Sequence, residues 1–542
     1  MGSNVKKAKA GKRDALSIET YPKSMGSVEN PDIERTKPSR WALIRPLVMV
    51  TLTISFGSSL QYGYNLWVVN HPAALIQDFY NETYRQRKKV FIQANFLNFL
   101  YNLTVTIFSL GGLIGSLLVC PIVDKCGRRG ALMLNNCLSI IASILMGFTS
   151  LVHAYEYTIF SRLVTGICSG IFSCVVPMYL AEMAPKKVRG TIMSVSMLFV
   201  AIGVLTSQVL GLPEHLGTKK DWPILLSLTG FLAMSQIIIL PAFPESPRYL
   251  LIQRRDEEKA RQALKKLRCQ ENVDREIEEL YQENLMERTE RAMNGFQLLF
   301  YRGLRWQIIS VIVLMGGQQL TGINAAYYYA ERIYAGMYLN RQETRYITMA
   351  SSICSILTLM VVVYAIDIVG RRVLILTGFG LCSLLCVLLT LTLELQITIP
   401  WMSYISSSLL FVFLIGHATG PGPIPNVIIA ELFLQSSRST GFVLGGLVHW
   451  LLNFVMGVLF LQIETRIGSY SFLLFWPLCV GTFIFILKVI PETMNRNFLE
   501  IRRLMSAQQA RRIQVQATDV KRNTRRRSTQ HGKRKRRKSS AR

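Results

Sequence analysis

Apolar residues in this chain gather into runs of about 20, the length at which a helix can cross the hydrocarbon core of a membrane. Polar segments separate these runs. The runs lie near residues 47–69, 95–119, 131–151, 157–181, 191–211, 223–243, 306–330, 346–367, 373–395, 400–430, 441–462 and 471–490. The pattern predicts an all-α membrane protein with 12 transmembrane helices, and an even number of crossings places both termini on one side of the membrane.

The polar segments divide the chain into five parts. The long segment between the sixth and seventh runs contains two stretches with the period of short amphipathic helices. The first 13 and the last 22 residues are basic and nearly free of apolar residues, which predicts disorder. We expect a disordered basic N-terminal tail at 1–45, a six-helix half at 46–243, a helical loop at 244–305, a second six-helix half at 306–490 and a basic C-terminal tail at 491–542.

Three short patterns occur once in each half, 243 to 249 residues apart. This spacing predicts two six-helix units of the same topology, the arrangement of transporters whose halves rock about a central site. The paired patterns are DKCGRR at 124–129 with DIVGRR at 367–372, Glu182 and Arg189 with Glu431 and Arg438, and PESPR at 244–248 with PETMN at 491–495.

The charged residues of these patterns lie where the predicted helices meet one membrane surface. One interpretation is that they anchor the helices to lipid headgroups. The other is a gate, in which acids of one half pair with arginines of the other. Several pairs worth about 0–1 kcal/mol each would let such a gate reopen. The acids are Asp124, Glu182, Asp367 and Glu431, and the arginines are Arg128, Arg129, Arg189, Arg371, Arg372 and Arg438.

Lysine and arginine flank the first and last runs and are numerous in the loop at 244–305. Because positive residues are retained on the cytosolic side of a membrane, we expect both termini and this loop in the cytosol. We expect the protein to lie in the plasma membrane. The sequence Asn81-Glu82-Thr83 then falls in the first outer loop, where a glycan can be attached to Asn81.

The net charge of the chain is +28, and the two tails hold much of it. In a protein with this many membrane crossings, basic tails favour contact with anionic lipid headgroups, at about 1 kcal/mol per basic residue near the surface. Nucleic acid is therefore not the partner that we expect.

The ten cysteines predict no disulfide framework, because none lies in an outer loop and no CxxC pattern occurs. The sequence also contains no metal-ligand cluster, no nucleotide-binding loop and no nucleophile–base set. We therefore expect neither an enzyme nor a protein with a cofactor or metal.

Four of the predicted spans carry neutral polar residues, which need partners inside a membrane. In the first span, Ser58, Gln61 and Asn65 share one face of a helical wheel, with Tyr62 beside them. Glycines and prolines permit helix breaks in the seventh and tenth spans. The segments are FGSSLQYGYNLWVVN at 56–70, GGQQLTGINAAYYYA at 316–330, GHATGPGPIPN at 416–426 and HWLLNF at 449–454.

These amide, hydroxyl and imidazole groups are donors and acceptors without a fixed charge. They could hydrogen-bond between helices, or they could line a site for a neutral ligand covered in hydroxyl groups. An ion or a charged metabolite would require a buried countercharge. No acid or base lies at mid-span, and Arg162 lies near the outer end of its span. The concentration on four spans favours the ligand site.

Residues 41–505 resemble the facilitative sugar transporters of the major facilitator superfamily. The motifs that carry this resemblance are DKCGRR, PESPRYLL, GGQQLTGIN, DIVGRR, GPGPIP and PET. Within the family the chain most resembles the fructose-transporting branch, through SSLQYGYN, FYNETY, GHA at 416–418 and VHWLLNF at 448–454. In the glucose branch, an acid stands at the position of Ala418 and an asparagine at that of His449.

The resemblance implies a set of sugar-contacting residues. These are Tyr62, Gln318, Gln319, Asn324, His417 and His449, with Asn453 beside the site. Three positions depart from the family pattern. Met197 stands where a sugar-binding glutamine is usual, Ser355 stands where an asparagine is usual, and Asn426 replaces a small or aromatic residue.

The function implied is facilitative uniport of a hexose, with fructose favoured, by alternating access. Sugar–proton members of the family carry an acid where this chain has Asn65, so proton symport is not expected. Two alternatives stay open. One is a transporter-like sugar sensor, and the other is a uniporter of another polyhydroxylated or less polar solute such as urate, which Met197 would suit.

Overall fold

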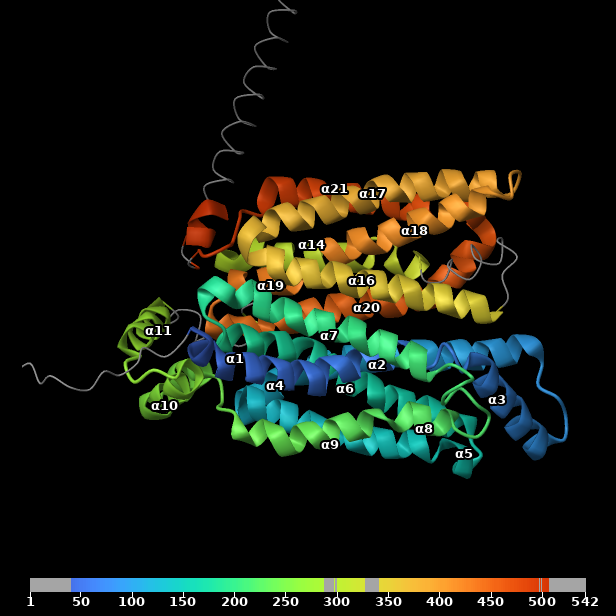
Figure 1. Cartoon of the computed structure of the whole chain (residues 1–542), viewed down its shortest axis with the longest axis horizontal. Helices are drawn as coiled ribbons and strands as arrows, with labels where there is room; N and C mark the ends of the chain where they lie inside the picture. Colours follow the sequence, from blue (N-terminus) through green and yellow to red (C-terminus); the bar gives the residue numbers. More distant parts are fainter. Residues whose placement is uncertain are drawn as a thin grey trace, which may run out of the picture.

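The computed structural model describes residues 40–286, 297, 300–326, 341–496, 498 and 500–505. Helices make up nearly all of this part of the chain, and it contains no β-strand. Figure 1 shows two helical bundles that lie along one another, one built from α1 to α9 and the other from α14 to α21. This arrangement confirms the predicted division into two halves. Most of the two predicted tails lies outside the described residues.

The first bundle contains six membrane crossings. The first crossing consists of three consecutive segments, and the last consists of two. The helix α3 does not cross and lies at one end of the bundle. The segments are α1 (Arg40–Ile54), the π-helical turn η1 (Ser55–Ser59), α2 (Leu60–Trp67), α3 (Ala73–Lys88), α4 (Ala94–Gly147), α6 (Tyr155–Met183), α7 (Arg189–Leu210), α8 (Trp222–Ser227) and α9 (Thr229–Ile239).

The helix α4 supplies two crossings. Its 54 residues would extend about 81 Å at 1.5 Å per residue, far more than a membrane core of about 30 Å. Gly127 breaks it, with φ of +77° and ψ of −177°. Ten helical segments of the described chain are long and apolar enough to cross a membrane. With α4 counted twice and the interrupted first crossing added, the number is the predicted twelve.

The second bundle repeats this plan. Its tenth crossing is interrupted between α18 and α19, where prolines at 421 and 423 cannot donate the backbone hydrogen bonds of a helix. The helix of its seventh crossing ends at Gln319, and Gly322 just beyond it has a φ of +93°. The helices are α14 (Arg305–Gln319), α16 (Arg341–Val369), α17 (Arg371–Gln396), α18 (Met402–Thr419), α19 (Ile424–Leu432), α20 (Gln435–Ile467) and α21 (Ser471–Val489).

Two short helices, α10 (Glu257–Arg268) and α11 (Asp274–Met286), form the predicted helical loop. Each is amphipathic, and the two bury Leu264, Ile277 and Leu280 between them. They lie at the end of the bundles where α1 begins, and α3 lies at the opposite end (Figure 1). We call these two ends the loop end and the α3 end.

The outward faces of the bundles are apolar. Phe231, Ile238, Val361, Tyr364 and Leu384 are each more than half exposed. A water-soluble protein rarely exposes so many large apolar side chains, whereas helices in contact with lipid do. The two bundles meet along α7 with α16 and along α4 with α20, and the functional site lies between these helices.

Candidate functional site

A cavity of about 370 Å³ lies between the two bundles, and α2, α4, α6 and α7 line one side of it. Helices α14, α16, α18, α19 and α20 line the other side. This volume lies within the range of small-molecule sites. All ten predicted positions line the cavity, and their role in binding stays a prediction. They are Tyr62, Met197, Gln318, Gln319, Asn324, Ser355, His417, Asn426, His449 and Asn453.

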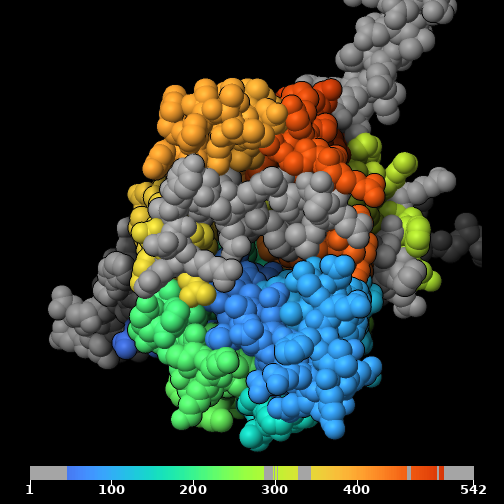
Figure 2. All heavy atoms as spheres, turned by 90° about the vertical axis from the view of Figure 1, so that its right-hand side faces the viewer, coloured from blue at the N-terminus to red at the C-terminus, as the bar shows by residue number. Residues whose placement is uncertain are grey.

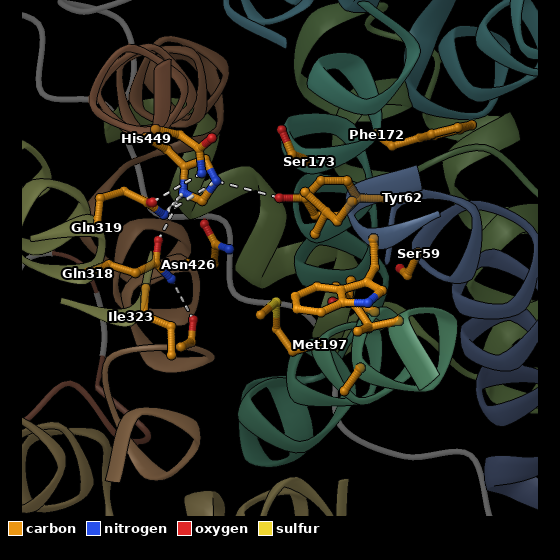
Figure 3. A pocket seen from close by; sticks show the side chains of 18 of the residues that line it. Ser59, Tyr62, Phe172, Ser173, Met197, Gln318, Gln319, Ile323, Asn426 and His449 are labelled. Atoms are coloured by element: carbon orange, nitrogen blue, oxygen red, sulfur yellow. Dashed lines mark hydrogen bonds between the residues drawn. The ribbon is translucent and has the colours of Figure 1, made fainter. Parts of the chain in front are cut away.

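The second bundle supplies a polar wall to the cavity (Figure 3). Gln318 donates from Nε2 to the backbone oxygen of Gly422 at 2.7 Å, which fixes the side chain against the break between α18 and α19. The side-chain oxygen of Gln319 faces Asn324 Nδ2 and Asn453 Nδ2, each at 3.4 Å. The break after α14 therefore brings amides from three segments to one surface.

His449 joins the two glutamines of this wall. Its Nδ1 lies 3.1 Å from Gln318 Oε1 and 2.9 Å from Gln319 Nε2. The nitrogen serves one of them at a time, because it donates to the oxygen when it carries the proton and accepts from the amide when it does not. The position of the imidazole proton thus decides which glutamine is left to hydrogen-bond a ligand.

Contacts cross the cavity from this wall to the first bundle. The Tyr62 hydroxyl lies 3.5 Å from His449 Nε2, and the Tyr62 ring packs edge-on against Trp450 with centroids 5.8 Å apart. Ser109 donates to Asn453 Oδ1 at 2.6 Å. These contacts narrow the middle of the cavity without closing it.

The wall from the first bundle is mostly apolar. On α7 the lining residues are Ser196, Met197, Val200, Ala201 and Val204, and Figure 3 shows Met197 facing the polar wall across the cavity. A ligand in this cavity therefore meets a wall of amides and imidazoles from the second bundle and a largely aliphatic surface along α7.

Arg162 is the single lining residue with a fixed charge among those described. It is 1% exposed, donates to the backbone oxygen of Asn65 at 3.2 Å, and lies over the Phe108 ring at 4.4 Å. No carboxylate lines the described part of the cavity. Asn65 thus contributes its backbone oxygen to Arg162, and its side chain is not part of the cavity wall.

The first span presents to the cavity a different face from the one that its polar residues indicated. Ser58, Gln61 and Asn65 do not line the cavity, whereas Ser59 and Tyr62 on the neighbouring face do. The side chains of Ser58 and Gln61 instead form hydrogen bonds with α9 and α4. Ser58 and Gln61 do share one face, as the wheel placed them. A helical wheel gives only relative positions, so it does not show which face of the span meets the cavity.

The recurring charges gather at the loop end, and their closest pairs lie within each bundle. Arg128 pairs with Glu182 at 2.9 Å in the first bundle. In the second, Arg371 pairs with Asp367 at 2.8 Å and with Glu431 at 3.0 Å. The prediction placed such pairs across the halves, and for these residues the structure differs. A buried charge needs a close partner, and the nearest partners are on adjacent helices of the same bundle.

The contacts that do cross the halves at the loop end centre on Glu182 and Asp367. Glu182 accepts from Gln435 Nε2 at 2.7 Å and lies 4.0 Å from Arg438. Asp367 accepts from the backbone nitrogen of Thr191 at 2.7 Å. These acids therefore hold the bundles together through an amide, a backbone group and one long ion pair.

The remaining predicted gate residues behave differently from one another. Arg129 and Arg372 donate to the backbone oxygens of Phe243 and Leu487, at 2.8 and 2.7 Å. Asp124 is exposed and forms no ion pair within the described structure. Arg189 is buried, and its Nε and Nη2 atoms lack hydrogen-bond partners among the described residues.

Two acids that the analysis of charges missed complete the loop end. Glu245 accepts from the backbone nitrogens of Arg128 and Arg129, and Glu492 accepts in the same way from those of Arg371 and Arg372, all at 2.9 to 3.1 Å. Each caps the helix that follows a glycine with positive φ, Gly127 or Gly370. Both acids stand in the repeated proline–glutamate pattern, which was the signal that could have identified them.

The helical loop also contacts both bundles. Glu283 of α11 pairs with Arg248, which follows α9, and lies 3.7 Å from Arg438 of α20. Burial raises the pKa of Glu283, but the charges of Arg248, Arg438 and Arg189 outweigh burial and give a net lowering. The loop end is therefore closed by contacts from three parts of the chain.

The sequence matches the family described as sugar (and other) transporter over residues 50–505. It is 47% identical to the human solute carrier family 2, facilitated glucose transporter member 5, over 87% of this chain and 93% of that protein. It is 44% identical to human member 7 of the same family, over 90% and 94%.

Solved structures share the fold at low sequence identity. The major facilitator superfamily proton:xylose symporter XylE, bound to 6-bromo-6-deoxy-D-glucose, superposes with a TM-score of 0.75 at 20% identity, over 85% of this chain and 99% of that one. The inward-open form of XylE from E. coli gives 0.63 at 20% identity, over 84% and 99%. The chain has the major facilitator fold and belongs to the sugar (and other) transporter family, a family of transporters and not of enzymes.

Proposed function

We propose that this protein is a facilitative uniporter of a hexose, with fructose favoured, and that it works by alternating access. The observation that carries the proposal is the polar wall of the cavity, where five uncharged amides and two imidazoles meet. A sugar presents many donors and acceptors and no charge, and this wall offers both kinds of partner. His417 adds a buried Nε2 atom that has no hydrogen-bond partner among the described residues.

The closed loop end indicates which conformation of the transport cycle the structure represents. The cavity extends along α2 and past its last residue to Asn70, which is in the direction of the α3 end. At the loop end the contacts of Glu182 and Asp367 join the bundles. We infer a state in which the site faces the α3 end, and transport requires that these contacts break. Figure 2 views the molecule from the α3 end, with the first bundle below and the second above.

Two residues support fructose over glucose. Ala418 lines the cavity where the resemblance places an acid in glucose transporters, and His449 stands in place of an asparagine. The relatives themselves are named facilitated glucose transporters, members 5 and 7. The preference for fructose therefore rests on the residues of the cavity.

Met197 supports a second candidate substrate. With Val200 and Val204 it makes one wall of the cavity aliphatic, and a less polar solute such as urate would bury more apolar surface there. The polar wall, however, would then keep amides without partners, at about 1–3 kcal/mol for each buried group left unsatisfied. A hexose with its hydroxyl groups towards the second bundle satisfies both walls better.

Uniport is supported by the absence of a carboxylate from the described cavity lining. Arg162 lies beside the backbone oxygen of Asn65, and an amide side chain at that position cannot accept a proton at neutral pH. A sensor, the other alternative, would bind sugar without moving it. Net flux of sugar distinguishes the two.

We place the protein in the plasma membrane, with both termini and the loop end in the cytosol. The α3 end is then outside, and Asn81 on α3 is available for glycosylation. Asn81 accepts from the Ile92 backbone nitrogen through Oδ1 at 3.4 Å, which leaves Nδ2, the atom that carries an N-glycan. The basic tails would contact anionic headgroups of the inner leaflet.

One experiment on the purified protein in liposomes tests the substrate. Uptake of labelled fructose is measured in competition with glucose, other hexoses, polyols and urate. We expect saturable uptake that fructose inhibits most strongly. Faster uptake of glucose, without competition from fructose, would overturn the fructose assignment, and uptake of urate alone would favour the less polar substrate.

A further inference from the structure

The first membrane crossing contains a π-helical turn, η1, immediately before the cavity. The backbone nitrogen of Leu60 donates to the oxygen of Ser55, five residues earlier. Such turns are rare and frequently occur at functional sites. Each adds one residue to a helical turn, so it rotates everything that follows by about 100° relative to a regular helix. The turn therefore determines which face of α2 meets the cavity.

A buried network of side chains surrounds this turn. Ser139 of α4 donates to Gln61 Oε1 at 2.7 Å, and Gln61 Nε2 faces Asn136 Oδ1 at 3.3 Å. Asn136 donates to Gln236 Oε1 on α9 at 2.8 Å. The same oxygen accepts from Ser58 Oγ at 2.8 Å. None of these side chains is more than 3% exposed.

The network also reaches the backbone of the turn. Gln61 Nε2 donates to the oxygen of Gly57 inside η1, and Gln236 Nε2 lies 3.5 Å from the oxygen of Thr53. A π-helical turn shifts carbonyls from their usual partners, and these two amides supply donors there. A Cβ atom at Gly57 would lie 2.3 Å from Gln236 Cδ, so glycine is what lets Gln236 approach.

Tyr62 is the residue that this arrangement orients. It follows Gln61 directly, and it points into the cavity towards His449 (Figure 3). Gln61 instead contacts Asn136 of α4. The next residue, Gly63, packs against the backbone oxygen of Val200 on α7, where an added Cβ would lie 1.9 Å away. The helix cannot rotate to correct a change in the turn, because α7 holds it on the other side.

We propose that Asn136 and Gln236 are positioning residues of the transport site, although neither lines the cavity. They stabilise the π-helical turn through Gln61, and the turn places the Tyr62 hydroxyl beside His449 and the substrate. The inference rests on the proposed function, because it assigns Tyr62 to substrate binding. If the inference holds, a buried polar network outside the cavity helps to determine the affinity for sugar.

The test compares two substitutions on the same helix. Gln236→Met has a similar volume but removes the contacts to Asn136, Ser58 and the turn. The control, Thr229→Val, removes the 2.9 Å hydrogen bond between the hydroxyls of Thr229 and Ser143. This bond joins the same two helices, α9 and α4, but it does not contact the π-helical turn. We expect Gln236→Met to raise the apparent KM for fructose about two- to tenfold, as for one lost hydrogen bond, with kcat little changed. Thr229→Val should change neither value.

A second background separates positioning from a general loss of stability. In Tyr62→Phe, which lacks the hydroxyl, Gln236→Met should cause no further rise in KM. An equal rise in both backgrounds, or an equal effect of Thr229→Val, would overturn the inference. If Gln236→Met fails to fold, Ser139→Ala removes a smaller part of the network and should raise KM in the same direction in the wild-type background alone.

A labelling measurement that needs no substrate tests the positioning role even if the proposed transport function is wrong. Tyr62→Cys is labelled with a maleimide from the α3 end, with the unsubstituted protein as background. Gln236→Met should change the labelling rate at position 62 at least severalfold, and Thr229→Val should not. If the protein moves no sugar, the proposed function fails while this measurement still decides the positioning role. An unchanged labelling rate contradicts it.

Discussion

The hydroxyl of Tyr62 lies 3.5 Å from Nε2 of His449, across the cavity between the two bundles. The other nitrogen of the same imidazole faces Gln318 and Gln319. His449 thus connects the first crossing with the polar wall through its two ring nitrogens. A substrate that enters the cavity must compete with these contacts or join them.

Replacement of His449 by asparagine should weaken the fructose preference. An asparagine is too short to reach both Gln318 and Tyr62, so the polar wall loses its contact with Tyr62 of the first bundle. We expect the apparent affinity for fructose to fall about three- to tenfold, as for one or two lost hydrogen bonds. The ratio of fructose to glucose uptake in liposomes measures this. A ratio that stays the same, in a protein that folds normally, would argue against a role for His449 in selectivity.

Met197→Gln should strengthen fructose binding. The change adds a donor and an acceptor to the aliphatic wall of a cavity that already contains polar groups. The expected gain is about 0.5–1.5 kcal/mol, or about two- to tenfold in apparent affinity. Competition binding to purified protein measures it, with Met197→Leu as a control of similar volume. Equal or weaker fructose binding in Met197→Gln would indicate that the natural ligand contacts the thioether instead.

Arg438→Glu should favour a state that is open at the loop end. It places a negative charge beside Glu182 and Glu283, where Arg438 now lies 4.0 and 3.7 Å from them. Cysteines introduced into the cavity lining should then react faster with a reagent supplied from the loop end. Lys187→Glu reverses an exposed charge nearby and serves as the control. Unchanged labelling in Arg438→Glu would contradict the gate, and these charges would then only anchor the helices at the membrane surface.

Stability at the loop end should depend on pH through Glu283. Its pKa is lower in the folded protein than the value of about 4.3 in an unfolded chain. Its charged form therefore stabilises the fold above that pH, and the contribution is lost as pH falls through the folded-state pKa. Glu283→Gln should lower the melting temperature in detergent at pH 6 to 8. The difference from the wild type should shrink below about pH 4, and a difference independent of pH would contradict this account.

Much of the fold could be predicted, because its signals are local. Long apolar runs identify spans, and the glycines before the paired arginines identify the turn at Gly127 and its counterpart at Gly370. The prolines after His417 identify the break in the tenth crossing. The positions of the cavity residues followed from the same local motifs together with the resemblance.

Two features could not be predicted, because they depend on three-dimensional partners. The orientation of Gln61 depends on a π-helical turn that α4 and α9 contact, and a helical wheel does not show which face of a helix meets the cavity. The pairing of Arg371 with Glu431 inside one bundle depends on which helices are adjacent at the loop end. The sequence contains the charges but not their distances.

Net flux of fructose through the purified protein in sealed liposomes, measured with equal pH on both sides and again with an imposed proton gradient, tests the central claim most directly. The account predicts saturable uptake of labelled fructose that stops when the inside concentration equals the outside concentration. A protonophore should leave this uptake unchanged, because no carboxylate lines the described cavity. Binding of fructose without flux would instead indicate a sensor. Accumulation above the outside concentration under an imposed proton gradient, abolished by the protonophore, would contradict facilitative uniport.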